Sequence, residues 1–331
     1  MRRIVFTLKN FIKDLNQDFL RYFTGKLKKN EKQNLSETQI YPKGKNIIKV
    51  LNIEAKQRLD KIDLSENSNI ASIGTCFAEE LSIHLKNTSS YLNYINYEKN
   101  VFNFSANWGR VYTVKNLKQI IDYSLTENYP LLVEQYKKKF FDPLREYSVG
   151  YFNSKDEAIN SIKRHRINSR EVFNKTNLIV ITLGQNEYWY DLKNNVTWGT
   201  TPAIIFRKEK NRFEAREYSF KENVEDLKYI VLKLRKFNPK INIIFTVSPV
   251  ASYATFISQN IVSQSFAGKC TLRAAIHEIL PLDDKIFYYP SFEFVLSDNP
   301  SSFIYDNRHV KRFKVSQILS SLNKSLLKNK F

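Results

Sequence analysis

Three short apolar runs in the sequence each end at a glycine or a small polar residue. They cover residues 69–73, 178–183 and 241–247. The first two runs are followed by Gly74 and Gly184, and the third is followed by Ser248. Such continuous runs are typical of strands buried on both faces of a parallel sheet. Because helical patterns lie between them, the sequence predicts an α/β fold with a doubly wound parallel sheet.

The first of these runs leads directly into a cysteine at the start of a predicted helix. Residues 74–78 read Gly-Thr-Cys-Phe-Ala, and an amphipathic helix is expected over residues 77–85. A tight turn between strand and helix places a reactive side chain at the carboxyl edge of the sheet. The helix dipole and the free backbone N–H groups would favour the thiolate of Cys76 and could hold an oxyanion. The alternative is a buried cysteine that only packs.

Length and composition indicate a folded protein with a core of its own. The chain has 331 residues, of which 42% are hydrophobic and 14% aromatic, enough for one large domain or two modest ones. Its two cysteines, Cys76 and Cys270, argue against a disulfide scaffold and suit a reducing compartment. No apolar run is long enough to cross a bilayer, so we expect a cytoplasmic protein.

The chain carries a formal net charge of +19. No DNA-binding or RNA-binding motif accompanies this charge, and we expect no nucleic-acid partner. A basic surface also suits an anionic membrane, an acidic glycan or a phosphate-bearing donor.

The N-terminal part differs in pattern from the rest. Residues 1–24 place apolar side chains at helical spacing with basic residues at the border, which predicts an amphipathic helix. This helix would lie on the inner face of the cell membrane, or pack on the domain or a partner; both hypotheses stand. Residues 25–45 lack periodicity and are expected to be a linker. The predicted domains are therefore 1–45, a basic helix and linker, and 46–331, the α/β domain.

An Asp-x-x-His pair near the C-terminus supplies the groups that a nucleophilic cysteine needs. Asp306 and His309 are three residues apart and would lie on one face of a helical turn. His309 beside Cys76, with Asp306 fixing the imidazole tautomer, is the set required for acyl transfer. The other histidines are interpreted as structural or solvated. No spacing matches a zinc site, so no metal is expected, and there is no Walker A or Rossmann glycine pattern.

Residues 74–78 resemble the signature of the GSCFA family, with Thr75 in place of the usual serine. Further segments follow in family order over residues 70–315, namely 104–113, 182–184, 246–250 and 289–293. The family is related to the SGNH (GDSL-like) hydrolases, and the resemblance implies a three-layer α/β/α arrangement.

The resemblance also implies roles for individual residues. Cys76 occupies the place of the nucleophilic serine, and Asp306 with His309 completes the catalytic set. Gly109 and Asn186 are similar to the glycine and the asparagine of the SGNH oxyanion hole. Members of this type resemble proteins encoded with capsule, O-antigen and other surface-polysaccharide genes, which implies a glycan or lipid-linked glycan substrate.

The leading hypothesis is an O-acyltransferase or esterase that moves or removes an acyl group, expected to be acetyl, on a cell-surface glycan or its precursor. Cys76 would attack the carbonyl, His309 would carry the proton, and Gly109 and Asn186 would help to stabilise the oxyanion. A thiol exchanges readily with thioesters, so an acyl-CoA is the expected donor, and no tightly bound cofactor is expected. Substrate contacts are expected from basic or polar side chains, namely Arg110, Ser248 and Arg308.

Two other functions stay open. The chain could be a non-catalytic glycan-binding or assembly subunit of a polysaccharide pathway, with Cys76 as a packing residue. A weaker alternative is a glycosyltransferase-like role in the same pathway, for which no nucleotide-sugar motif is found.

Overall fold

The computed structural model describes residues 35–327 except 45, 89–90, 99–101, 128, 203–208 and 298–300. The predicted helix over residues 1–24 and most of the predicted linker lie outside this part. The chain divides after Val50, and the site lies in the second unit, Leu51–Phe331. The predicted domain boundary at residue 46 stays a prediction.

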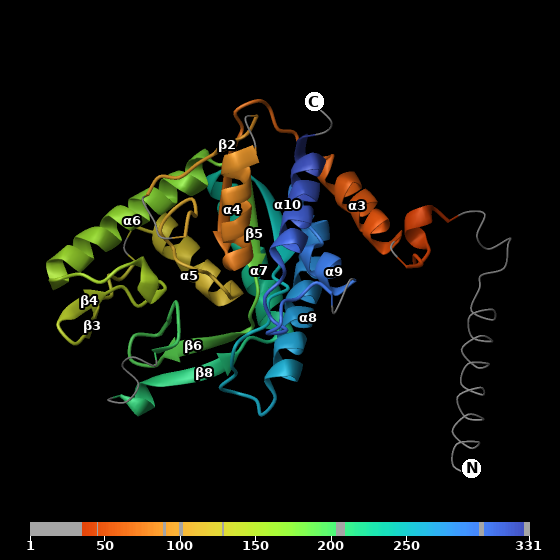
Figure 1. Cartoon of the computed structure of the whole chain (residues 1–331). Coiled ribbons are helices and arrows are strands. Elements are labelled where there is room, and N and C mark those ends of the chain that lie inside the picture. The colour runs from red at the N-terminus through yellow and green to blue at the C-terminus, as the bar shows by residue number, and fades with distance from the viewer. Residues whose placement is uncertain are drawn as a thin grey trace, which may run out of the picture. The chain divides into compact units, whose positions relative to one another are not determined.

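A five-stranded parallel sheet lies at the centre of this unit (Figure 1). Its strands are β1 (Asn69–Gly74), β2 (Asn93–Tyr94), β5 (Leu178–Leu183), β9 (Asn242–Val247) and β10 (Ile286–Tyr288). Their order is β10-β9-β5-β1-β2. The three predicted runs became β1, β5 and β9, and they are neighbours in the sheet. The order reverses between β1 and β5, where ligands bind in doubly wound folds.

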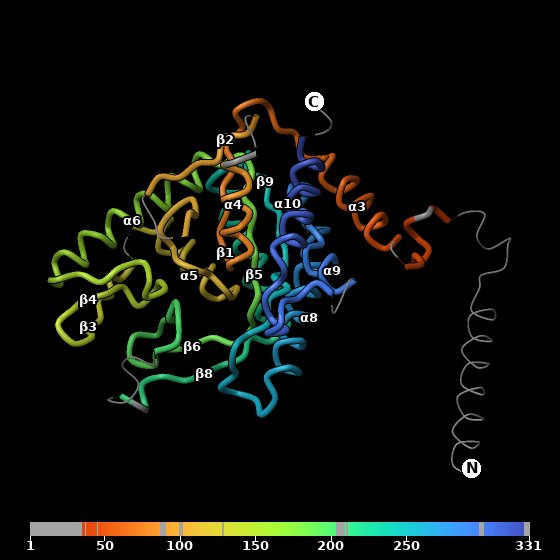
Figure 2. The backbone as a smooth tube through the Cα atoms, viewed as in Figure 1, coloured from red at the N-terminus to blue at the C-terminus, as the bar shows by residue number. Residues whose placement is uncertain are grey.

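Helices cover both faces of the sheet, which confirms the predicted α/β class. The structure has α3 (Asn46–Leu59), α4 (Cys76–Thr88), α5 (Val114–Leu125), α6 (Lys155–Lys175), α7 (Phe220–Phe237), α8 (Ile261–Ile279), α9 (Ser291–Leu296) and α10 (Arg312–Leu327). Figure 2 follows the same path as a tube, with α4 and α10 in front of the strands. Helix α7 packs against α5 and α8, and α10 packs against α4 and α9.

Local sequence explains where these helices begin. Ser219 and Glu222 form a capping box at the start of α7, and Thr113 caps α5 by accepting a hydrogen bond from the Asn116 N–H. The apolar positions predicted for one face of α7 are buried. Packing of that face against the core stabilises the helix more than intrinsic propensity does.

Two small antiparallel sheets accompany the central one. The predicted excursion over residues 190–220 contains part of a three-stranded sheet, made of β6 (Glu187–Asp191), β7 (Val196–Thr197) and β8 (Phe213–Glu217). A hairpin of β3 (Glu134–Tyr136) and β4 (Lys139–Phe141) was not predicted. Short 3-10 helices complete the described elements: η1 (Glu37–Gln39), η2 (Tyr147–Val149), η4 (Lys210–Arg212) and η5 (Leu280–Leu282).

Gly74 ends β1 in contact with the backbone of β5. Its φ is +142°, and a Cβ there would lie 2.1 Å from the carbonyl oxygen of Thr182. The next N–H, that of Thr75, donates to this same oxygen at 3.1 Å. Only glycine fits such a conformation at such a close approach. The residue two positions before Cys76 is therefore fixed by sterics at the point where the strand order of the sheet reverses.

We predict that Gly74→Ala destabilises the protein far more than Gly150→Ala. Gly150 has a similar φ of +144°, but its nearest neighbour would be Phe152 Cζ at an ordinary 3.6 Å. The control therefore carries only the backbone strain, about 1–3 kcal/mol. The Gly74 variant adds the clash with Thr182, which we expect to cost at least about 2 kcal/mol more. Urea unfolding measures both, and equal losses would contradict this explanation.

Candidate active site

A cavity of about 270 Å³ opens at the carboxyl ends of β1, β5 and β9. Residues that follow these strands, together with two loops, line it: Thr75, Cys76, Arg110, Tyr112, Gly184, Gln185, Ser248, Val250, Ala251, Tyr253, Arg308 and His309. Five residues of the predicted site meet here: Cys76, Arg110, Ser248, Arg308 and His309. Side chains separated by more than two hundred positions in the sequence thus share one cavity.

Cys76 is the first residue of α4. Burial raises the pKa of its thiol above the ordinary value, although the Arg110 guanidinium and the backbone N–H groups of Phe77 and Cys76 act to lower it. The predicted effect of the helix N-terminus is therefore present, but burial outweighs it. The thiol form predominates at neutral pH, so attack on a carbonyl needs a group that takes the proton.

His309 and Asp306 lie in a tight turn and not in a helix as expected. The His309 carbonyl accepts from the Ile304 N–H at 2.9 Å, and Asn307 adopts a φ of +55°. Asp306 Oδ2 lies 2.5 Å from His309 Nδ1, and Asp306 Oδ1 accepts from the Arg308 and His309 N–H groups. The hydrogen bonds from His309 hold the pKa of Asp306 well below its usual range. This contact assigns the proton to Nδ1 and leaves Nε2 available to the cavity.

The two arginines of the predicted site have different surroundings. Arg110 lies 3.5 Å from carboxylate oxygens of both Glu79 and Glu146 and stacks on the Phe102 ring. Its positive charge acts to lower the pKa of Cys76. Arg308 donates to the Ala251 carbonyl and lies over the Tyr253 ring, 5.1 Å from its centroid. Arg308 therefore joins the His309 turn to the loop after β9.

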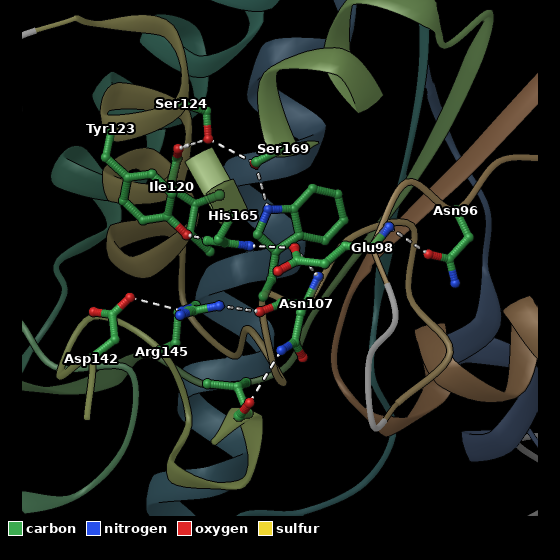
Figure 3. Close-up of polar contacts among 12 residues, drawn as sticks. Asn96, Glu98, Asn107, Ile120, Tyr123, Ser124, Asp142, Arg145, His165 and Ser169 are labelled. Carbon is green, nitrogen blue, oxygen red and sulfur yellow. Dashed lines mark hydrogen bonds and ion pairs between the residues drawn. The ribbon is translucent and has the colours of Figure 1, made fainter. Parts of the chain in front are cut away.

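A buried polar network fixes the loop that carries Arg110 (Figure 3). The Asn107 N–H donates to Glu98 at 3.0 Å, and Glu98 also lies 2.7 Å from His165 Nδ1. Arg145 pairs with Asp142 at 2.8 Å and donates to the Asn107 carbonyl at 3.0 Å. Burial lowers the pKa of His165, which keeps its ring neutral. Both sides of Asn107 are thereby held, two residues before Gly109.

The family assignment follows from a comparison of the chain with protein families. Residues 69–322 match the model of the GSCFA family, a span that includes Cys76 and His309. The chain belongs to the GSCFA family. The resemblance seen in the sequence is confirmed. No curated protein matches this GSCFA protein.

Two solved structures are similar to the GSCFA protein. One is a family two carbohydrate esterase from Clostridium thermocellum in complex with cellohexaose; it is 10% identical, with a TM-score of 0.34, over 80% of this chain and 65% of that chain. This chain thus spans less than two thirds of that one. The other is the periplasmic domain of a lipopolysaccharide acetyltransferase from Salmonella ser. Paratyphi A. It is 11% identical, with a TM-score of 0.33, over 88% of this chain and 100% of that chain. At this low similarity, neither structure indicates the function of this chain.

Two residues of the predicted oxyanion hole do not line the cavity of the GSCFA protein. Gly109, with a φ of +72°, packs against Glu146 beside the cavity wall. The Asn186 side chain is buried; its Nδ2 donates to the Tyr218 carbonyl and its Oδ1 accepts from Asn223. The structure therefore directs the Asn186 amide away from Cys76, and the preceding residue, Gln185, faces the cavity instead.

Tyr112 and Gln185 were not identified from the sequence. Burial raises the pKa of the Tyr112 hydroxyl, so it stays protonated and can donate a hydrogen bond. Both residues are neighbours of predicted ones, two positions after Arg110 and one before Asn186. This proximity is one signal that the sequence contains for them, and Tyr112 also lies in the segment 104–113 that resembles the family.

A second cavity of about 290 Å³ adjoins the first and shares Tyr112, Gln185 and Tyr253 with it. Its other lining residues include Trp189, Trp198 and Phe256. The Trp189 and Phe256 rings meet edge to face with centroids 4.9 Å apart. The GSCFA protein thus has an aromatic groove that leads to Cys76.

Over the described ranges, no group of three or more His, Cys, Asp or Glu side chains could hold a metal ion. Among those same residues, every helix is too short or too polar to cross a membrane.

We predict that Arg145→Met costs about 3–5 kcal/mol of unfolding free energy, because it leaves the buried Asp142 carboxylate unpaired. Arg216→Met is the matched control, since its ion pair with Glu214 is exposed and contributes at most about 1 kcal/mol. Urea denaturation of both variants checks the difference. A loss for Arg145→Met no larger than for the control would show that the network does not fix the loop.

Proposed function

We propose that this GSCFA protein transfers or removes an O-acyl group, acetyl in the first instance, on a cell-surface glycan or its precursor. The observation that carries the proposal is the meeting in one cavity of the Cys76 thiol, the Asp306-bound imidazole of His309 and the Arg110 cation. Nucleophile, base and orienting carboxylate are the parts that acyl transfer through a covalent intermediate needs.

In the proposed mechanism, Cys76 Sγ attacks the acyl carbonyl and forms the S–C bond. His309 Nε2 takes the thiol proton and delivers it to the leaving group as the tetrahedral intermediate collapses to a thioester. Asp306 holds Nδ1–H and stabilises the imidazolium. A glycan hydroxyl or a water molecule then attacks the thioester and gives its proton to the same Nε2. A transferase and an esterase would therefore differ only in the acceptor, which is a sugar hydroxyl in the first and water in the second.

The oxyanion needs hydrogen-bond donors aimed at the carbonyl oxygen. Gln185 and the hydroxyl of Tyr112 line the cavity, and the backbone N–H of Cys76 lies at the start of α4. We propose these three as the donors. The Gln185 amide takes the part that the sequence suggested for Asn186, and Gly109 supports the loop of Arg110.

The donor and the acceptor are proposed from the chemistry of the two cavities. A thioester such as an acyl-CoA exchanges readily with a thiol, and Arg110, Arg308 and Ser248 would face its polar parts or an acidic sugar. In the aromatic groove, the rings of Trp189 and Tyr253 suit the C–H face of a pyranose, while amide, hydroxyl and carboxylate groups suit its hydroxyls. Contact of residues 1–24 with a membrane surface stays a prediction.

The second candidate is a glycan-binding subunit without chemistry. The aromatic groove favours it, because the groove would hold a sugar whether or not Cys76 reacts. The two functions differ in whether an acyl group ever becomes attached to the protein.

We predict that incubation with acetyl-CoA or p-nitrophenyl acetate acetylates Cys76, as measured by intact-mass spectrometry and peptide mapping. Cys76→Ala should abolish the adduct, and His309→Ala should slow its formation by about 10²–10⁴. Cys270→Ala is the control, because this exposed thiol lies outside the cavity. Turnover that survives in Cys76→Ala would remove Cys76 as the nucleophile.

Replacing Gln185 tests the proposed oxyanion donor against the one suggested by the sequence. Gln185→Leu should lower kcat by about 10²–10³ with little change in stability. Asn186→Leu should instead destabilise the fold by about 1–3 kcal/mol, because it removes the buried hydrogen bonds that the Asn186 amide makes with the Tyr218 carbonyl and with Asn223. Steady-state kinetics and thermal unfolding separate the two. A folded Asn186 variant with the larger loss of kcat would favour the original assignment.

A further inference from the structure

Lys269 on α8 is a buried lysine that is hydrogen-bonded to the wall of the cavity that holds Cys76. Its side chain is only 3% exposed. The ammonium donates to the Gly184 carbonyl at 3.0 Å and to the Ser248 carbonyl at 2.7 Å, so it joins the ends of β5 and β9. Both of these residues line the cavity. Nothing in the sequence distinguishes this lysine from the many others.

A buried ammonium is costly unless a negative charge compensates it. Two carbonyl dipoles solvate Lys269, but no carboxylate in the described part of the chain pairs with it. Burial therefore lowers its pKa to about 7, and Cys76 is the one charge that acts in the opposite direction. Because Coulomb attraction is reciprocal, a proton on Lys269 must favour the Cys76 thiolate equally.

We propose that Lys269 is the charge partner of Cys76, and that above neutral pH the two groups share a single proton. When the thiol ionises, the S–H bond breaks and an N–H bond forms at Nζ, with solvent carrying the proton. The total charge of the pair does not change, and the thiolate forms beside an ammonium group that stabilises it, which apolar surroundings would not do. Lys269 is a positioning residue that acts through Cys76.

Other charges near the pair have separate effects. Arg110 and Glu79, which form an ion pair, also act on Cys76, where they lower and raise its pKa respectively. His309 and Arg308 line the same cavity. Arg110 is already paired with two carboxylates, whereas Lys269 meets only carbonyls. Cys76 acts on the pKa of both cations, but Arg110 stays protonated, so Lys269 is the one whose protonation can change near neutral pH.

The pH dependence of Cys76 alkylation by iodoacetamide tests this inference on the full chain carrying Cys270→Ser. The shared proton predicts two rises in rate, one near pH 7 and one at high pH. Lys269→Met should lose the first rise, so that its rate at pH 7.5 falls at least about tenfold, the equivalent of one unit of thiol pKa. Arg110→Met, the control, should lower the rate but keep the first rise.

A folded Lys269→Met variant that keeps the rise near pH 7, or that loses rate equally at every pH, overturns the proposal. A lysine with a purely structural role would produce the equal loss of rate at every pH. If this variant does not fold, the Nζ resonance of Lys269 in ¹⁵N-lysine-labelled protein gives the answer. It should titrate in one step near pH 7 in Cys76→Ala, and stay partly protonated at higher pH in the unsubstituted chain. Identical curves would overturn the proposal.

This inference deepens the proposed function, and its test separates the two. Alkylation needs no substrate, so a missing first rise counts against Lys269 alone. A normal two-step profile in a protein that no acyl donor acylates would instead count against acyl transfer and leave the Lys269 pair in place.

Discussion

The ends of β1 and β5 lie so close together that no side chain fits between them. Gly74 meets the Thr182 carbonyl, and the Val111 N–H closes the other side by donating to the Gly74 carbonyl at 2.8 Å. Cys76 lies two positions after Gly74, and its side chain is therefore located at the point where the strand order reverses. Every other part of the site is arranged around a sulfur whose place is set by backbone contacts.

The surroundings of that sulfur have opposite effects on its ionisation, and some of them offset part of the free-energy cost that burial imposes on the thiolate. Burial favours the neutral thiol, while Arg110 and the start of α4 favour the thiolate. Asp306 fixes the ring of His309 through the contact between its Oδ2 and the ring Nδ1. Lys269, the proposed charge partner of Cys76, is held by the Gly184 and Ser248 carbonyls at the ends of β5 and β9. In the proposed mechanism the Cys76 thiol gives up its proton when it reacts, and His309 would take that proton, while Lys269 is proposed to share it.

The sequence predicted the central strands and the convergence of Cys76 with His309, because apolar runs and strand order are local or topological properties. It did not predict the orientation of side chains after β5. Asn186 and Gln185 are adjacent, and the packing of Tyr218 and Asn223 decides which of them faces the cavity. Lys269 was missed for a related reason. A lysine in a helix is ordinarily solvated, and only the fold places this one under the sheet edge.

A crystal structure of the protein after reaction with chloroacetone tests the central claim most directly, because the reagent attaches a methyl ketone to a thiol and its carbonyl stands where the acyl carbonyl would. We predict the label on Cys76, inside the cavity, with its oxygen within about 3 Å of the Gln185 amide and the His309 ring within hydrogen-bond reach. A label on Cys76 that points away from the cavity, or an imidazole on another side of the sheet edge, would contradict the account.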